Sequence, residues 1–97
     1  MSVYLNGRFL PLADAKVSVL DRGFVFGDGV YEVVPVYSNK PFRLDEHLRR
    51  LQDSLDNIRL ANPHGMGEWR ELILKLIAQQ DFPDQSLYIQ VTRGTPV

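Results

Sequence analysis

Apolar residues between positions 44 and 58 recur every three or four positions, which predicts one amphipathic helix. The stripe consists of Leu44, Leu48, Leu51, Leu55 and Ile58. Asp45 and Glu46 would lie in the first turn, where the helix dipole favours negative charge. We expect Asn62-Pro63 and Gly65 to end this helix, because proline and glycine interrupt helical backbone.

A second helix is predicted from about Glu68 to Gln80 by the same periodicity. Its apolar side consists of Trp69, Leu72, Ile73, Leu76 and Ile77. Two other stretches have the character of strands, since they alternate or are rich in β-branched and aromatic residues. They are VYEVVPVY at positions 30–37, and SLYIQVTRG at positions 86–94, where Leu87, Ile89 and Val91 face one way.

Short turn signals divide the rest of the chain. Asn6-Gly7 is flanked by two apolar runs and predicts a type I′ hairpin, because both central residues of that turn need positive φ. The segment SNKP at 38–41 is predicted to turn the chain, so that PFRL at 41–44 can pair back as the arm of a second hairpin. Residues 12–28 show no regular pattern, apart from a possible short strand at Lys16–Val19.

The predicted order is four strands, two helices and a final strand. Strands joined by hairpins, with the helices grouped together, favour an α+β fold: a mostly antiparallel sheet with two helices packed on one face. Ninety-seven residues form one domain at most. No apolar run approaches the ~20 residues that span a bilayer, and the N-terminus lacks the pattern of a signal peptide. We therefore expect a cytoplasmic protein without a membrane partner.

Composition argues against several kinds of chemistry. The formal net charge of -1 argues against nucleic acid as a partner, because binding it needs a concentrated basic surface. The chain has no cysteine, and its two histidines, His47 and His64, are distant in sequence. We therefore expect no metal site. No serine lies in the context of a hydrolase nucleophile elbow.

The strand at 30–37 carries one candidate site. Alternation places Tyr31, Val33, Pro35 and Tyr37 on one face, which is apolar with phenol groups, as the wall of a ligand pocket would be. The alternative is a strand packed on a core, with the tyrosine hydroxyls reaching solvent. Pro35 has no amide donor, so it must lie at a sheet edge or where pairing is broken.

The first predicted helix carries another candidate. His47 and Arg50 lie on adjacent turns beside the apolar stripe, and the planar fork of arginine suits a phosphate group. The alternative is an arginine whose stem covers apolar surface, next to a half-buried histidine at the helix edge.

Three segments, taken in order, resemble a known family. They are YLNGRFLPLADAKVSVLDRGFVFGDGVYEVVPVY, PFRLDEHLRRLQDSLDNIRL and YIQVTRG, and the resemblance covers nearly all 97 residues. The chain resembles the N-terminal domain of the class IV (fold type IV) pyridoxal-phosphate-dependent aminotransferases. This family includes D-amino acid aminotransferases, branched-chain aminotransferases and aminodeoxychorismate lyases. The motif FGDGVYEVVPVY is most similar to the D-amino acid branch.

The resemblance implies roles for four residues. Arg50, in the motif EHLRRL, would contact the phosphate of pyridoxal 5′-phosphate. Tyr31 would help to hold the substrate carboxylate, and Val33 and Pro35 would line the same pocket. Enzymes of the D-amino acid branch can carry lysine at the position of Pro35, so the proline leaves the substrate preference open.

The resemblance also implies what this chain lacks. The lysine that forms the Schiff base with the cofactor is expected beyond Val97, because Lys16, Lys40 and Lys75 all match positions of the N-terminal domain. Residues 1–97 would then be the small N-terminal domain, a fragment without catalytic residues that does not transaminate alone.

For the parent protein, the resemblance implies a homodimeric enzyme that moves an amino group from a D-amino acid, such as D-alanine, to a 2-oxo acid. The alternatives within the family are a branched-chain aminotransferase and an aminodeoxychorismate lyase. An alternative of another class is a non-catalytic binding or dimerisation module.

Overall fold

Five strands, two long helices and two short helical segments make up the computed structural model, which describes residues 1–96. In chain order the elements are β1 (Ser2–Leu5), β2 (Arg8–Pro11), η1 (Leu12–Asp14), α1 (Arg22–Phe26), β3 (Gly29–Tyr37), β4 (Lys40–Pro41), α2 (Leu44–Asn57), α3 (Met66–Ala78) and β5 (Gln85–Thr92). β1 and β2 form a separate hairpin, the other strands form a sheet in the order β4-β3-β5, and every pairing is antiparallel. The predicted α+β fold is confirmed, with its strands divided between two sheets.

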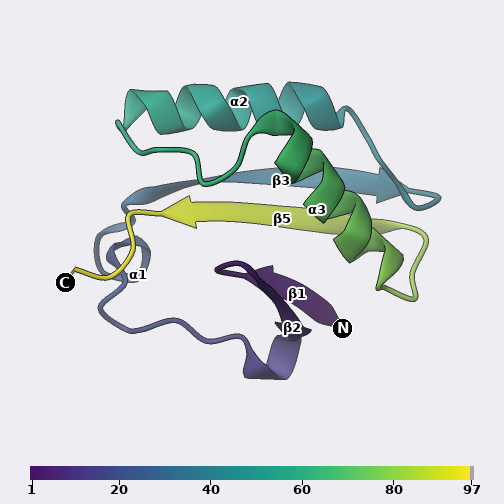
Figure 1. The fold of residues 1–97 in the computed structure, drawn as a ribbon, viewed down its shortest axis with the longest axis horizontal. Coiled ribbons are helices and arrows are strands. Elements are labelled where there is room, and N and C mark those ends of the chain that lie inside the picture. Colours follow the sequence, from purple (N-terminus) through teal and green to yellow (C-terminus); the bar gives the residue numbers. More distant parts are fainter. Residues whose placement is uncertain (97) are drawn as a thin grey trace.

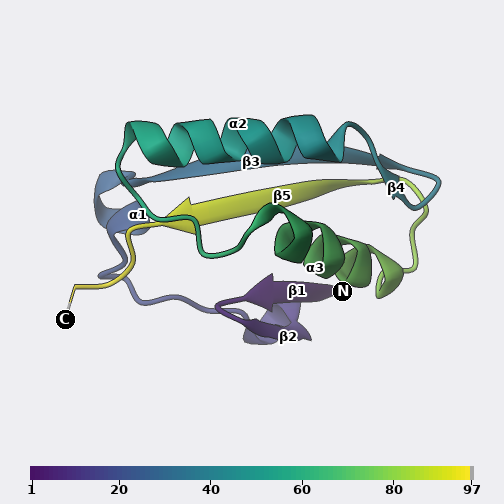
Figure 2. The same cartoon turned by 45° about the horizontal axis from the view of Figure 1, so that its top comes forward.

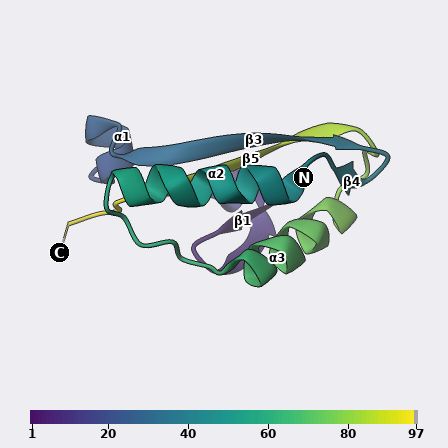
Figure 3. The same ribbon diagram turned by 90° about the horizontal axis from the view of Figure 1, so that it is seen from above.

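Both long helices lie on the same side of the three-stranded sheet, as predicted (Figure 1 and Figure 3). α2 runs along β3, and the β1–β2 hairpin lies beyond α3 on the side away from α2 (Figure 2). The opposite face of the sheet is uncovered within residues 1–96, and its aromatic residues Tyr31, Tyr37 and Tyr88 are exposed. No helix in this described part of the chain combines the length and the apolar character that crossing a membrane requires.

The core lies between the sheet and the two helices. Leu48, Leu51 and Leu55 of α2 pack with Val34 and Val36 of β3, and none of these side chains is more than 1% exposed. The other buried apolar residues are Leu44, Trp69, Ile73, Ile77, Leu87 and Ile89. Burial of a large aliphatic side chain contributes about 1.5–3 kcal/mol. The periodic stripes in the sequence are therefore the surfaces that hold the layers together.

Two hairpin turns use the same backbone geometry. Asn6 and Gly7 have φ values of 49° and 89°, which confirms the predicted hairpin with positive φ at both central residues. Ser38 and Asn39, at 49° and 64°, repeat this arrangement between β3 and β4 although neither is glycine. The second hairpin arm is shorter than predicted because Arg43 adopts a φ of 56°, which takes the chain out of the strand and into α2.

The end of α2 comes before the predicted Asn62-Pro63 signal. Arg59 has a left-handed φ of 55°, and its N–H donates to the carbonyl of Asp56 at 3.1 Å. The N–H of Leu60 donates to the carbonyl of Leu55 at 3.0 Å. These bonds define a Schellman motif, which usually has glycine at the left-handed position. This helix end could not be predicted from the sequence, because arginine and not glycine occupies the left-handed position.

The possible strand at Lys16–Val19 is not formed, so this prediction is wrong. Val17 and Val19 are exposed, and their β-branched side chains have no buried face to cover. The chain instead continues into the short helix α1. Asp21 caps this helix, since its Oδ1 accepts a hydrogen bond from the N–H of Gly23 at 2.8 Å.

Two arginine-to-glycine substitutions should have opposite effects on stability. Arg59→Gly is expected to raise the free energy of unfolding, because a left-handed φ costs a non-glycine residue about 1–2 kcal/mol, partly offset by the greater entropy of glycine in the unfolded chain. Arg49→Gly, at an exposed position within α2, is expected to lower it by about 1 kcal/mol. Urea denaturation measures both values. Similar losses in the two variants would contradict the proposed helix ending.

Candidate functional site

Three of the predicted site residues lie together on the uncovered face of the sheet. Tyr31 and Val33 are 63% and 44% exposed, and Pro35 is partly buried. The ring of Tyr31 stacks on that of Tyr88 in β5, with 5.7 Å between centroids and 19° between planes. The alternative of a strand packed on the core through this face does not hold, because the core lies on the other face. The pattern of alternation therefore placed these side chains correctly relative to one another.

β3 is an edge strand along most of its length. It pairs with β5 from Gly29 to Val36, whereas β4 pairs only with Val36 and Tyr37. The carbonyl of Pro35 accepts from the N–H of Phe42 at 2.8 Å, so the backbone of Pro35 faces away from β5. The missing N–H of this proline therefore removes no bond to β5. Pro35 lies where the pairing with β4 stops, which agrees with the expectation of an edge or a break in pairing.

A buried carboxylate joins the sheet to α2. Glu32 points to the inner face of β3 and is 5% exposed. Its Oε2 accepts from Nε of Arg50 at 2.9 Å, and its Oε1 accepts from Nη2 of Arg50 at 2.9 Å. Nδ1 of His47 lies 2.8 Å from Oε1 and donates to it, because an ionised carboxylate can only accept.

The ionisation of this group follows from its surroundings. Burial by itself raises the pKa of the Glu32 carboxyl. The hydrogen bonds and positive charge of Arg50 and His47 together outweigh burial, so the pKa of Glu32 lies below its ordinary value. The hydrogen bond with Glu32 also raises the pKa of Arg50. Both groups therefore stay charged at neutral pH.

Arg50 is held in place without being buried. Its side chain is 65% exposed although two of its nitrogen atoms donate to Glu32. The N–H groups that do not reach Glu32 face solvent and can meet an anion. The interpretation of Arg50 as a mere cover for apolar surface does not account for this bidentate pair.

The structure brings His47 and Arg50 together as the sequence predicted, but through a residue that sequence reasoning missed. Glu32 is the one charged residue on the otherwise apolar inner face of β3, beside Val34 and Val36. A buried carboxylate at that position needs a cationic partner. The single charge on an apolar strand face is therefore the sequence signal by which Glu32 could have been identified. Arg50 of α2 approaches β3 from the inner face, whereas Tyr31 projects from the outer face. Glu32, the neighbour of Tyr31 in the strand, binds Arg50 and so connects the two.

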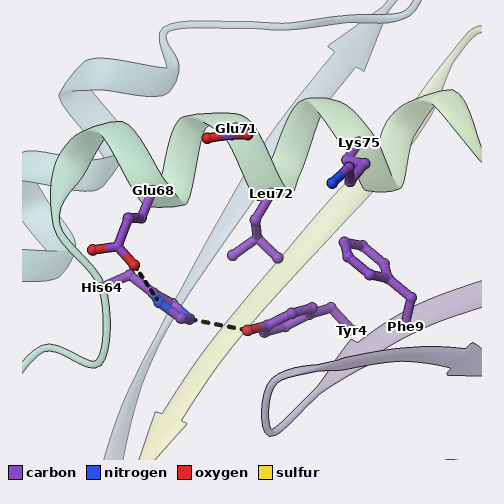
Figure 4. A pocket seen from close by; sticks show the side chains of 7 residues that line it. All are labelled: Tyr4, Phe9, His64, Glu68, Glu71, Leu72 and Lys75. Atoms are coloured by element: carbon purple, nitrogen blue, oxygen red, sulfur yellow. Dashed lines mark hydrogen bonds and ion pairs between the residues drawn. The ribbon is translucent and has the colours of Figure 1, made fainter.

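A cleft lies between the β1–β2 hairpin and α3, and none of the predicted site residues lines it (Figure 4). It has a volume of about 200 Å³. The Tyr4 hydroxyl lies 3.3 Å from Nε2 of His64, and Nδ1 of His64 lies 3.5 Å from Glu68. This chain of contacts holds the hairpin on α3. Within residues 1–96, no group of three or more histidine, aspartate or glutamate side chains is placed to hold a metal ion.

Comparison with known proteins identifies the family. Residues 29–96 match the sequence model of the family described as Amino-transferase class IV. The chain therefore belongs to the class IV aminotransferases. It is 45% identical over 94 residues to a D-alanine aminotransferase of Listeria monocytogenes, which covers 97% of the chain and 32% of that protein.

Solved structures show the same fold. A branched-chain amino acid aminotransferase of T.th., complexed with N-(5′-phosphopyridoxyl)-L-glutamate, superimposes with a TM-score of 0.91 at 26% identity, over 99% of this chain and 34% of that one. The 4-amino-4-deoxychorismate lyase of Pseudomonas aeruginosa gives a TM-score of 0.71 at 31% identity, over 86% and 29%. The chain thus spans about a third of the length of the proteins that it matches.

The buried carboxylate should make stability depend on pH. Because the pKa of Glu32 is lowered by folding, its contribution is fully present above the unfolded-state pKa of about 4.3 and is lost as the pH falls through the folded-state value. Between pH 6 and 3, the free energy of unfolding should fall more steeply for the native protein than for Glu32→Gln. Parallel curves from urea denaturation at each pH would show that Glu32 is not ionised in the folded protein.

Proposed function

We propose that the protein is a pyridoxal 5′-phosphate-dependent aminotransferase that moves an amino group from a D-amino acid, such as D-alanine, to a 2-oxo acid. Membership of the class IV family supports the type of reaction, and the D-alanine aminotransferase relatives support the amino donor. The observation that carries the proposal is the exposed guanidinium of Arg50, which buried Glu32 fixes beside the edge strand that carries Tyr31.

Arg50 fits the phosphate of this cofactor. The raised pKa of its guanidinium keeps the positive charge, and Glu32 fixes the plane of the fork while leaving donors toward solvent. The phosphopyridoxyl compound in the T.th. relative supports the same cofactor here. When bound, pyridoxal phosphate supplies an electron sink that allows an amino acid to lose its α-proton.

The uncovered face of β3 forms one wall of the proposed substrate pocket. Tyr31 can donate its hydroxyl proton to a substrate carboxylate, and the stacked ring of Tyr88 limits where that hydroxyl can lie. Val33 and Pro35 continue the same face with uncharged surface. Such a surface suits a small apolar side chain such as that of alanine.

The remainder of the active site belongs to the rest of the protein in this proposal. The relatives are about three times as long as the chain, and the lysine that carries the cofactor would lie in that additional length.

We propose a homodimer in the cytoplasm. Phe24 and Phe26 of α1 are 74% and 76% exposed, and exposed aromatic side chains on one short helix favour a protein contact.

The substrate proposal is tested with the full-length protein. D-alanine with 2-oxoglutarate as acceptor should give pyruvate, and L-leucine should be a poor donor. A strong preference for L-leucine would contradict the D-amino acid assignment and favour a branched-chain enzyme. Release of pyruvate from an aminodeoxychorismate-like substrate without any amino acceptor would instead indicate a lyase, as the likeness to the Pseudomonas aeruginosa lyase allows.

The cofactor proposal is tested by reduction. Borohydride treatment should leave a covalent pyridoxyl-phosphate adduct on the full-length protein, which intact mass spectrometry detects. A protein isolated without adduct, and unable to acquire one from added pyridoxal phosphate, would point to a non-catalytic module.

Two neighbouring arginines give a matched test of phosphate binding. Arg50→Lys keeps the charge but loses the fork, so the affinity for pyridoxal phosphate should fall about ten- to a hundredfold, as expected for a lost charge-assisted hydrogen bond. Arg49→Lys should leave it unchanged, because Arg49 is exposed and makes none of the hydrogen bonds to Glu32. Absorbance titration of the apo-protein measures both. Equal affinities for pyridoxal phosphate in the two variants would contradict the assignment of Arg50 to the phosphate site.

A further inference from the structure

Arg93 follows directly after β5 and contacts two other segments of the chain. Its Nε donates to Oδ2 of Asp28 at 2.7 Å, and its Nη2 donates to the carbonyl of Ile58 at 2.7 Å. Its backbone N–H donates to the carbonyl of Asp28 at 3.1 Å. Asp28 directly precedes β3, and Ile58 directly follows α2. The three segments meet at the end of the molecule where α2 ends and β5 ends (Figure 1).

The electrostatics of this junction favour arginine. The carbonyl of Ile58 lies at the C-terminus of α2, where backbone acceptors lack helical partners and the helix dipole is negative. The carboxylate of Asp28 faces the same guanidinium. Both charged side chains are about two-thirds buried, so their attraction is less screened than that of a surface pair. One planar fork satisfies both acceptors, which a lysine ammonium cannot do in the same geometry.

The start of β3 fits closely against β5 at the same place. The bond from Arg93 to the carbonyl of Asp28 continues the pairing of the strands beyond the Gly29–Thr92 pair. A Cβ atom on Gly29 would lie 2.6 Å from the carbonyl oxygen of Val91, so only glycine allows this approach. The position of β3 along β5 is therefore fixed, and Arg93 extends that constraint to α2.

Within residues 1–96, two polar connections hold α2 to β3. One is Glu32 with Arg50 and His47 in the middle of the helix, and the other is Arg93 at its C-terminal end. Arg50 is carried by α2, and Tyr31 is carried by β3. Whether one ligand can contact both side chains depends on the position of α2 along β3.

We propose that Arg93 is a positioning residue: through Asp28 and Ile58 it fixes α2 relative to the start of β3, and so sets the separation between Arg50 and Tyr31. The inference rests on the proposed function in assigning cofactor and substrate to those two residues. It does not place Arg93 in contact with either ligand.

The test compares two arginine-to-lysine variants of the full-length protein. Arg93→Lys removes the fork that joins three segments. Arg70→Lys is the control, because Nε of Arg70 pairs with Asp45 at 2.8 Å and joins α3 to α2 without involving β3. Pyridoxal phosphate is titrated into each apo-protein, well below its unfolding temperature, and the visible circular dichroism of the bound cofactor is recorded.

We expect the affinity of Arg93→Lys for pyridoxal phosphate to fall about tenfold, with an altered dichroic band, because a small displacement of positioned groups is costly. The Arg70→Lys control should keep both the affinity and the band. Asp28→Asn, which retains a hydrogen-bonding side chain, provides a second variant if Arg93→Lys does not fold, and it should behave like Arg93→Lys. An unchanged affinity and band in a folded variant at either position would overturn the proposal.

Hydrogen exchange of the apo-proteins gives a readout that is independent of the cofactor. In Arg93→Lys, amides at residues 28–34 and in the last turn of α2 should exchange faster than in Arg70→Lys. Equal exchange at these positions would also overturn the positioning role. If the native protein binds no pyridoxal phosphate, the proposed function fails, whereas the exchange data still decide whether Arg93 fixes α2 against β3.

Discussion

The buried carboxylate of Glu32 is the constraint on which the arrangement of this domain depends. An unpaired charge on the inner face of a sheet is strongly unfavourable, so Arg50 and His47 of α2 must lie where they can hydrogen-bond to it. The apolar contacts between α2 and β3 are not directional and would tolerate small shifts of the helix. The bidentate pair is directional, and it selects one position of the helix along the strand. The same pair leaves the guanidinium of Arg50 exposed and fixed in orientation.

The edge position of β3 would allow charged and aromatic groups to serve the proposed site, although they lie on opposite sides of the sheet. Beside Tyr31 and Val33, no strand within residues 1–96 pairs on the side away from β5. In the proposed site, a molecule bound at this open edge of β3 would contact Arg50 on the inner side and Tyr31 on the outer side. Pro35 is compatible with this edge because it lacks only a donor that β5 does not use. The short pairing of β3 with β4 thus leaves open the edge at which we propose the site.

Much of the candidate site was accessible from local pattern. Alternation placed Tyr31, Val33 and Pro35 on one face, and helical periodicity placed His47 and Arg50 on adjacent turns. Their roles toward cofactor and substrate come from the family resemblance and remain predictions. Glu32 was not recognised, although it is the one charged residue on the apolar inner face of β3, and its partners on α2 became known only from the packing of the layers. Arg93 was missed for the same reason, since its partners Asp28 and Ile58 are far away in sequence.

The sequence by itself determined the α+β class, the two hairpin turns, the two apolar helical stripes and the family, because periodicity, turn chemistry and motif order are local properties of the chain. Only the tertiary structure decided that β1 and β2 form a separate sheet, that Lys16–Val19 forms no strand, and that α2 ends in a left-handed arginine. Strand partners and buried charge pairs depend on groups brought together from distant positions. Hydrogen bonds and desolvation are satisfied only once the layers have packed, so a linear pattern cannot specify them.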